Sequence, residues 1–307
     1  MYNVFIDGAE GTTGLKIHEY FKKRSDINVI KIDEAKRKDL DERLAMIKKA
    51  DISFLCLPDA ASREIAAAAP ADCRILDTST AHRTNDDWIY GMPELSKGQR
   101  EKIQGSNRVA VPGCHASGAI LIIKPLLEAG YLSADYPFSI FSLTGYSGGG
   151  KKMIADYESC ETVRSPGQYG ITQNHKHLPE IMKATGLKTR PSFMPVVGHF
   201  FSGMEVTVPL SGGFLKKEIS SIKELGDMYK EYYADSRIVN VLDTTGENGF
   251  IYSDRLAGSN KLEISVEGNI ENPIVVATYD NLGKGASGAA VQNMNIMLGI
   301  DETKGLI

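Results

Sequence analysis

The chain has 307 residues, of which 42% are hydrophobic and 24% are charged, and its formal net charge is -4. This length and composition are typical of a globular protein that buries a large core and forms two domains. The small negative charge gives no electrostatic reason to expect binding to nucleic acid or to an anionic membrane.

The cysteines and the start of the chain suggest where the protein works. Cys56, Cys73, Cys114 and Cys160 are widely spaced and form no CxxC pair. This pattern favours a reducing compartment and argues against a disulfide framework and a metal site. The chain opens into a strand-like run without the regions of a signal peptide, and no apolar run reaches the length of a membrane span. We therefore expect a cytoplasmic enzyme without membrane contact.

A glycine-rich turn follows the first predicted strand, Tyr2 to Ile6, and precedes a helical pattern that ends near Phe21. Its three glycines have the spacing G-x-x-G-x-x-G. Such glycines let the backbone turn tightly and approach a pyrophosphate, which rests on the helix N-terminus. Glycine triplets are common in turns, so the position between strand and helix is what predicts a dinucleotide-binding loop. The expected cofactor contacts are Gly8, Gly11, Thr12, Thr13 and Gly14.

The second predicted strand, Ile27 to Ile32, is followed by Asp33 and a basic cluster. An acidic residue at this point suits the ribose 2′-hydroxyl of NAD, whereas basic residues suit the 2′-phosphate of NADP. Because the basic cluster comes immediately after Asp33, we predict NADP, held by Lys36 and Arg37. The alternative is that these residues only solvate the start of the next helix.

Helices and strands then alternate. They are a helix from Asp39 to Ala50, a strand from Ile52 to Leu57, a helix from Pro58 to Ala69 and a strand from Arg74 to Leu76. This alternation predicts a Rossmann-type, doubly wound parallel α/β sheet, which binds ligands at the carboxyl ends of its strands. Arg83 follows the fourth strand, so its guanidinium is a candidate clamp for a phosphate or a carboxylate. The alternative is an arginine on a surface loop.

Cys114 follows a short apolar run, Val109 to Val111, and a turn at Pro112-Gly113. An amphipathic segment comes next, so the pattern predicts strand, turn and helix, with Cys114 in the first helical turn. The unpaired N–H groups and the positive end of the helix dipole favour a thiolate there and can stabilise an oxyanion. We predict a nucleophile, with a small buried cysteine as the alternative.

Glycine, serine and lysine are concentrated between Thr144 and Lys152, after a predicted strand from Phe138 to Leu143. We expect a flexible loop rich in N–H groups that binds an anion such as a leaving phosphate, with Ser147, Gly148 and Lys151 as contacts. The alternative is a mobile loop without a ligand.

Three histidines are candidates for proton transfer. His175 and His177 lie two residues apart before a predicted helix. Their spacing also permits metal binding, but the sequence offers no thiolate or carboxylate partner, so we favour proton transfer. His199 stands alone before an alternating strand, Met204 to Leu210, where a histidine is more often structural.

The remaining strands, Leu262 to Val266 and Ile274 to Thr278, complete a second, mostly antiparallel sheet in an α+β domain. A last helix, Val291 to Leu298, is expected to return to the first domain. We therefore predict a dinucleotide-binding domain over 1–113, a catalytic and dimerisation domain over 114–285 and a C-terminal helical segment over 286–307.

Six segments together carry a family resemblance. They are the glycine loop, Ser79 to Arg83, Pro112 to Cys114, Ser147 to Lys151, His175 to Glu180 and Asp280 to Gly285. In this order they closely resemble the N-acetyl-γ-glutamyl-phosphate reductase family in its shorter, type 2 form. One departure is that the family usually reads Cys-Tyr-Pro-Thr where this chain has Cys114-His115-Ala116-Ser117. The nucleophile is kept, but the entry into the helix differs.

The resemblance implies a semialdehyde dehydrogenase-like fold and a reaction of arginine biosynthesis. In this reaction NADPH reduces N-acetyl-γ-glutamyl phosphate to N-acetylglutamate semialdehyde, through a thioester on Cys114, and phosphate is released. It implies His177 first, and His175, as the proton-transfer residue, with His199 kept because related enzymes place a histidine on a comparable strand. It also implies a cofactor contact for Asn281 and substrate binding by Arg83. Because an antiparallel sheet in the second domain often offers a dimer face, we expect a homodimer or homotetramer.

Three alternatives remain. The nearest is an aspartate-semialdehyde dehydrogenase, or another acyl-phosphate reductase, which would share the fold and the nucleophile. A cysteine hydrolase or acyltransferase would use a Cys114–His177 dyad without a redox step, and the glycine loop argues against it. A catalytically silent nucleotide sensor is disfavoured because both Cys114 and the histidines are present.

Overall fold

The computed structural model describes residues 1–306 and divides them into two compact units. Unit 1 comprises Met1–Gly113 together with the segment from Ala286 to the end of the described chain, and unit 2 comprises Cys114–Gly285. The chain thus leaves unit 1 directly before Cys114 and returns to it after Gly285.

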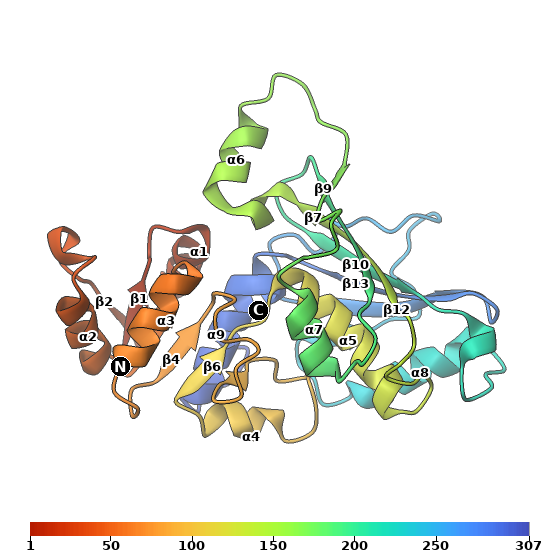
Figure 1. The fold of residues 1–307 in the computed structure, drawn as a ribbon, viewed down its shortest axis with the longest axis horizontal. Coiled ribbons are helices and arrows are strands. Elements are labelled where there is room, and N and C mark those ends of the chain that lie inside the picture. The colour runs from red at the N-terminus through yellow and green to blue at the C-terminus, as the bar shows by residue number, and fades with distance from the viewer. Residues whose placement is uncertain (307) are drawn as a thin grey trace. The chain divides into compact units, whose positions relative to one another are not determined.

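Unit 1 contains a six-stranded sheet in the order β2-β1-β3-β4-β6-β5 (Figure 1). Its strands are β1 (Tyr2–Asp7), β2 (Ile27–Ile30), β3 (Ile52–Leu55), β4 (Ile75–Asp77), β5 (Ile89–Tyr90) and β6 (Arg108–Ala110). Its helices are α1 (Thr12–Phe21), α2 (Leu40–Lys49), α3 (Asp59–Ala68), α4 (Gln99–Gln104) and α9 (Gly288–Met297). Every strand pairing is parallel, which confirms the predicted Rossmann-type sheet.

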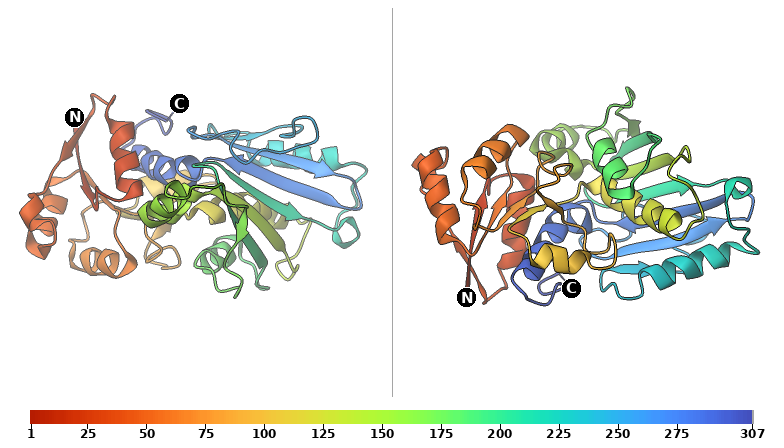
Figure 2. Two further views of the ribbon diagram at one scale, coloured as in Figure 1. Left: turned by 90° about the horizontal axis from the view of Figure 1, so that it is seen from above. Right: turned by 60° about the horizontal axis from the view of Figure 1, so that its bottom comes forward.

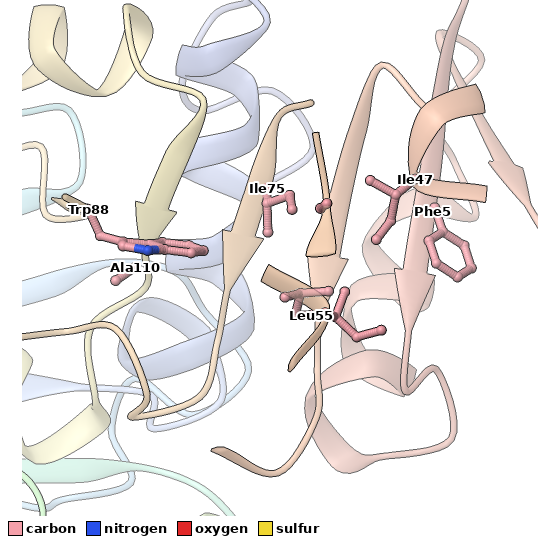
Figure 3. Close-up of a cluster of buried hydrophobic side chains, with 8 residues drawn as sticks. Phe5, Ile47, Leu55, Ile75, Trp88 and Ala110 are labelled. Atoms are coloured by element: carbon pink, nitrogen blue, oxygen red, sulfur yellow. The ribbon is translucent and has the colours of Figure 1, made fainter. Parts of the chain in front are cut away.

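The core of unit 1 is built from strand residues and the helices that cover them. Figure 3 shows Phe5, Ile47, Leu55 and Ile75, which are almost completely buried, with Trp88 and Ala110 in the same cluster. Strand β3 is buried along its whole length, as expected for a parallel strand covered on both faces. Helix α9 is also buried throughout and packs against α1, as Figure 2 shows, and against α4 and β4.

Unit 2 contains a seven-stranded sheet in the order β11-β12-β13-β10-β7-β9-β8. Its strands are β7 (Ser139–Gly145), β8 (Gly167–Gln168), β9 (Ser192–Gly198), β10 (Met204–Pro209), β11 (Val239–Val241), β12 (Leu262–Gly268) and β13 (Pro273–Tyr279). Its helices are α5 (Cys114–Glu128), α6 (Gly150–Glu158), α7 (Leu178–Thr185) and α8 (Ile222–Tyr232). Pairings β7–β9 and β11–β12 are parallel and the others are antiparallel, so the predicted, mostly antiparallel sheet is confirmed.

Helix α5 is the central helix of unit 2. It is highly apolar and packs against β10, β13, α7 and α8. Figure 1 shows α5, α7 and α8 on the same side of the sheet. Because α5 is buried, the position of Cys114 at its N-terminus is fixed.

One expectation about local structure is wrong. The segment expected to be a flexible loop forms a short 3-10 helix, Tyr146–Gly149, that continues into α6. Its glycines serve close packing, because a Cβ at Gly145 would lie 2.6 Å from the carbonyl oxygen of Phe201. Helix α8 lies in a stretch for which the sequence analysis predicted no element, and it buries Leu225 and Tyr229 among its eleven residues.

Candidate functional site

The glycine loop between β1 and α1 requires glycine at two of its three positions. Gly8 has a φ of +82°, and a Cβ there would lie 2.3 Å from the carbonyl oxygen of Cys56. A Cβ at Gly14 would lie 2.7 Å from the carbonyl oxygen of Gly8, whereas the nearest atom to a Cβ at Gly11 would be 3.4 Å away. The loop therefore packs backbone against backbone and brings its N–H groups to the start of α1. Thr12 and Thr13 begin that helix.

A cavity of about 660 Å³ opens beside this loop, at the carboxyl ends of β1, β2 and β3. Its apolar lining includes Phe5, Ile30 and Leu57. Its polar lining includes Asp7, Gly8, Lys31, Arg37, Lys38 and Arg43. Apolar walls with a few charged groups are typical of sites for small ligands, and basic side chains add affinity for phosphate.

Arg43 is a basic residue of this cavity to which the sequence analysis gave no role. Its Nε donates to the carbonyl oxygen of Arg37 at 2.7 Å and lies 3.5 Å from a carboxylate oxygen of Asp7. Its two terminal amino groups have no hydrogen-bond acceptor among residues 1–306. The guanidinium is thus fixed in orientation while its outer edge remains available to a ligand. Burial raises the pKa of Asp7 to about 6, and the charge of Arg43 acts against this rise.

The predicted basic residues are placed differently from one another. Lys36 pairs with Glu42 and does not line the cavity. Arg37 lines the cavity and pairs with Glu34 at 2.8 Å. Asp33, the alternative NAD contact, caps a short 3-10 helix by accepting from the backbone N–H of Ala35 at 3.0 Å.

Arg83 is held by backbone carbonyl groups within unit 1. Its Nε donates to Val111 at 2.9 Å and its Nη2 to Thr78 at 3.0 Å. It therefore links the loop after β4 to the segment that precedes Cys114. The same loop is braced by the buried carboxylate of Asp77, which lies 2.6 Å from Nδ1 of His82.

Cys114 is the first residue of α5, as the sequence pattern predicts. The hydroxyl of Tyr279 donates to the carbonyl oxygen of Cys114 at 2.6 Å and accepts from the backbone N–H of Gly118 at 3.1 Å. Burial, helped by the charge of Cys114, raises the pKa of Tyr279, so this hydroxyl keeps its proton. A Cβ at Gly285 would lie 3.1 Å from the Cβ of Cys114, which explains a small residue at that position.

Three histidines of unit 2 form one cluster. The ring centroids of His175 and His177 are 4.7 Å apart, and His115 lies 5.6 and 5.5 Å from them. Nδ1 of His175 accepts from the backbone N–H of His177 at 3.2 Å. Nε2 of His177 lies 3.7 Å from the buried carboxylate of Glu180. Burial and the charge of Lys176 lower the pKa of His175 to about 4, so its ring is neutral near pH 7.

His115 is the member of this cluster to which the sequence analysis gave no role. Its Nδ1 lies 2.6 Å from the hydroxyl of Ser142, and its Nε2 lies 2.6 Å from the hydroxyl of Tyr169. Burial, with the charges of His175 and Lys176, lowers the pKa of His115 to about 3. Ser142 and Tyr169 carry no local sequence signal, because only the fold brings them to the helix.

The other predicted site residues of unit 2 form a second group. Ser147 is buried and accepts from the side-chain amide of Asn281 at 3.0 Å. Asn281 in turn accepts from the backbone N–H of Gly203 at 2.9 Å. A Cβ at Gly148 would contact the same amide at 3.5 Å. Lys151 is exposed in the first turn of α6.

His199 lies away from the cluster of three histidines. It follows β9, packs against Tyr146 and Tyr157, and accepts from the backbone N–H of Arg164 at 2.8 Å. Its contacts are those of a residue that holds the loop before β8 in place.

The described residues contain neither a candidate metal centre nor a membrane-spanning helix. Within residues 1–306, no group of three or more His, Cys, Asp or Glu side chains is arranged to hold a metal ion. No helix in the described part of the chain combines the length and the apolar character needed to cross a membrane.

Comparison with known proteins agrees with this geometry. The family model "Semialdehyde dehydrogenase, NAD binding domain" matches residues 3–105, and "Semialdehyde dehydrogenase, dimerisation domain" matches residues 114–281. N-acetyl-gamma-glutamyl-phosphate reductase 2 of Pseudomonas putida is 43% identical, over 98% of both chains. N-acetyl-gamma-glutamyl-phosphate reductase of Brucella ovis is 44% identical, over 96% of this chain and 98% of the relative.

Among solved structures, aspartate semialdehyde dehydrogenase II of Vibrio cholerae, complexed with ASA, superimposes with a TM-score of 0.71 at 15% identity, covering 97% of this chain and 98% of that chain. Aspartate semialdehyde dehydrogenase of Francisella tularensis gives 0.71 at 14% identity, covering 97% and 100%. These structures show the shared fold, and the sequence relatives identify the group within the family. With its glycine loop and its cysteine at the start of a buried helix, the chain belongs to the semialdehyde dehydrogenase family, among the N-acetyl-γ-glutamyl-phosphate reductases.

Proposed function

We propose that this chain reduces N-acetyl-γ-glutamyl phosphate to N-acetylglutamate semialdehyde and phosphate, with NADPH as the reductant, in arginine biosynthesis. The observation that carries the proposal is Cys114 at the N-terminus of α5, in a unit that also holds a cluster of three histidines. The names of relatives at 43–44% identity over nearly the whole chain support the substrate.

The first chemical step is assigned to Cys114. Its thiolate attacks the γ-carbonyl carbon of the acyl phosphate, and the C–O bond to phosphate breaks, so that a thioester and inorganic phosphate form. The backbone N–H groups at the start of α5 stabilise the oxyanion of the tetrahedral intermediate. The bonds from Tyr279 to Cys114 and Gly118 support this role because they hold the first turn of the helix in place.

Unit 1 is suited to hold the nicotinamide cofactor. When bound, the cofactor supplies the hydride that reduces the thioester to the aldehyde. Gly8 and Gly14 allow the loop to pack closely, so that its N–H groups lie at the start of α1, where a pyrophosphate would bind. Arg43, with its outer edge open to the cavity, and Arg37 support binding of a 2′-phosphate, hence NADP rather than NAD. Asp33 supports the same choice, because its carboxylate caps a turn and does not line the cavity.

Proton transfer is assigned first to His177. It takes the proton of the Cys114 thiol before attack and returns a proton when the thiolate is released with the aldehyde. Glu180, 3.7 Å from Nε2, orients the ring. His175 supports this arrangement because its ring is neutral and accepts from the backbone of His177.

Substrate binding is assigned to two groups. Ser147, held by Asn281, and the N–H groups of Gly148 and Lys151 suit the phosphate. Arg83 suits either that phosphate or the α-carboxylate, since a guanidinium binds both.

The sheet of unit 2 supports a homodimer or homotetramer. One of its faces carries Phe141 and Leu143 of β7 beside Met194 and Val196 of β9, and these apolar side chains are only partly buried. Such a face is typical of a surface that a second copy covers.

The test is an assay in the reverse direction, which follows reduction of the nicotinamide cofactor. N-acetylglutamate semialdehyde and aspartate semialdehyde are compared, each with NADP or NAD and with or without phosphate. We expect phosphate-dependent reduction of NADP with the acetylated substrate alone. Turnover of aspartate semialdehyde would instead make this an aspartate-semialdehyde dehydrogenase, and preference for NAD would refute the assignment of the 2′-phosphate site.

A further inference from the structure

The side chain of His115 joins three segments that are far apart in the sequence. It projects from the first turn of α5, is 2% exposed, and bonds Ser142 of β7 through Nδ1 and Tyr169, after β8, through Nε2. Its ring also packs edge-on against His175. No other histidine in residues 1–306 has both ring nitrogens within 2.6 Å of a hydroxyl group.

The chemistry of these two bonds leaves His115 no free position for proton transfer. With its lowered pKa, the imidazole is neutral at physiological pH, so one nitrogen donates and the other accepts. Of the two hydroxyls, one therefore donates to the ring and the other accepts from it. A ring engaged in this way cannot take a proton from Cys114 without losing a bond.

The segment from Tyr169 to His177 has little regular structure of its own and depends on such anchors. The backbone N–H of Tyr169 donates to Pro195 at 3.0 Å. Gln173, which has a φ of +56°, exchanges two side-chain bonds with the backbone of Phe193 at 2.7 and 2.8 Å. Both of these anchors attach the segment to the sheet. The bond between Tyr169 and His115 attaches it to the helix that begins with Cys114.

We infer that His115 is a positioning residue: through Tyr169 it fixes the segment carrying His175 and His177 to the first turn of the nucleophile helix. The inference rests on the proposed thioester mechanism, because that mechanism requires a histidine and Cys114 in fixed register. A displacement of about 1 Å in such a register costs about a hundredfold in rate.

The test compares two amide substitutions that keep different halves of the imidazole. The amide of His115→Gln takes the place of Nε2 and retains the bond to Tyr169. The amide of His115→Asn takes the place of Nδ1 and retains the bond to Ser142. We expect kcat to fall about a hundredfold in H115N but less than about tenfold in H115Q. The KM for NADPH is expected to stay unchanged in both variants.

A double-mutant cycle identifies the partner. Tyr169→Phe removes the hydroxyl and keeps the ring, and it is expected to match H115N. The double variant is expected to be no slower than either single variant, since both remove the same bond. Ser142→Ala, the matched control at the other nitrogen, is expected to retain most of the activity. Equal losses in H115N and H115Q, or fully additive losses with Tyr169→Phe, would overturn the inference.

Hydrogen exchange separates this inference from the reaction itself. Amides in peptides covering 169–177 are expected to exchange about tenfold faster in H115N than in the wild type or H115Q, while those of α5 keep their protection. Unchanged exchange in this segment would refute the positioning role even if the enzyme is active. Faster exchange in a protein without the proposed activity would leave the anchor standing and refute the reaction.

Discussion

The candidate site in unit 1 is formed mainly by backbone, whereas the one in unit 2 is formed by side chains. In unit 1 the glycine loop makes a site from backbone, and a missing Cβ at Gly8 and Gly14 is its main feature. In unit 2 the cluster around His115 makes a site from side chains that bond one another across distant segments. A substitution in the first site therefore acts locally, through volume or charge. A substitution in the second acts on a partner that lies elsewhere in the sequence, so its effect depends on which bond is lost.

The largest effect is expected at Cys114, the residue to which the first chemical step is assigned. Cys114→Ala removes the nucleophile, and kcat should fall by at least about a thousandfold. Binding of NADPH, measured by titration, should be unchanged. Cys160→Ala is the matched control and should keep full activity. Retention of more than about a thousandth of the activity in C114A would exclude the covalent route.

Gly8→Ala tests the backbone character of the site in unit 1. The added Cβ would meet the carbonyl oxygen of Cys56 at 2.3 Å, at a φ of +82°. We expect a loss of about 1–3 kcal/mol in the free energy of unfolding and about a hundredfold weaker binding of NADPH. Gly11→Ala, which has no such clash, should change both much less. Equal effects of the two substitutions would contradict the account of this loop.

Arg43→Gln tests charge in the same cavity. Loss of a charge-assisted bond to a 2′-phosphate should cost about 1.5–3 kcal/mol, or roughly tenfold to a hundredfold in kcat/KM with NADPH, and little with NADH. Lys36→Gln removes the same charge outside the cavity and should leave the preference between the two cofactors unchanged. An equal loss with NADPH and NADH would place Arg43 against a different part of the cofactor.

These cases also show what the sequence can predict. Nine of the thirteen strands in residues 1–306, the position of the glycine loop between strand and helix, and Cys114 at a helix start depend on local patterns, and they were predicted correctly. Strands β5, β8, β9 and β11 were not predicted. Which of the neighbouring basic side chains line the cavity depends on contacts that the sequence does not show, because Lys36 pairs with Glu42 while Arg43 of α2 lines the cavity. Tyr169 could not be found at all, since it lies 54 residues from His115 and meets it only through the pairing of β7 and β9.

The smallest expected effect concerns stability. The pKa of His115 falls from 6.5 in the unfolded chain to about 3 in the folded protein, so the unfolded chain binds more protons below pH 6.5. The stability contributed by keeping the ring neutral is fully present above pH 6.5 and is lost as the pH falls toward 3. By pH 5.5 it should lower the free energy of unfolding by about 1 kcal/mol. Urea titrations at a series of pH values should show that the free energy of unfolding falls more steeply between about pH 7 and pH 5 in the wild type than in H115Q. Parallel dependences on pH would contradict this prediction.

The most direct test of the thioester mechanism is a burst experiment in the reverse direction without phosphate. The enzyme, at a concentration high enough to count its active sites, is mixed with N-acetylglutamate semialdehyde and NADP. The account predicts one NADPH per active site, then a halt, then renewed turnover when phosphate is added. Cys114→Ala should show no burst. Formation of NADPH only after phosphate is added would contradict the covalent intermediate and with it the central role of Cys114.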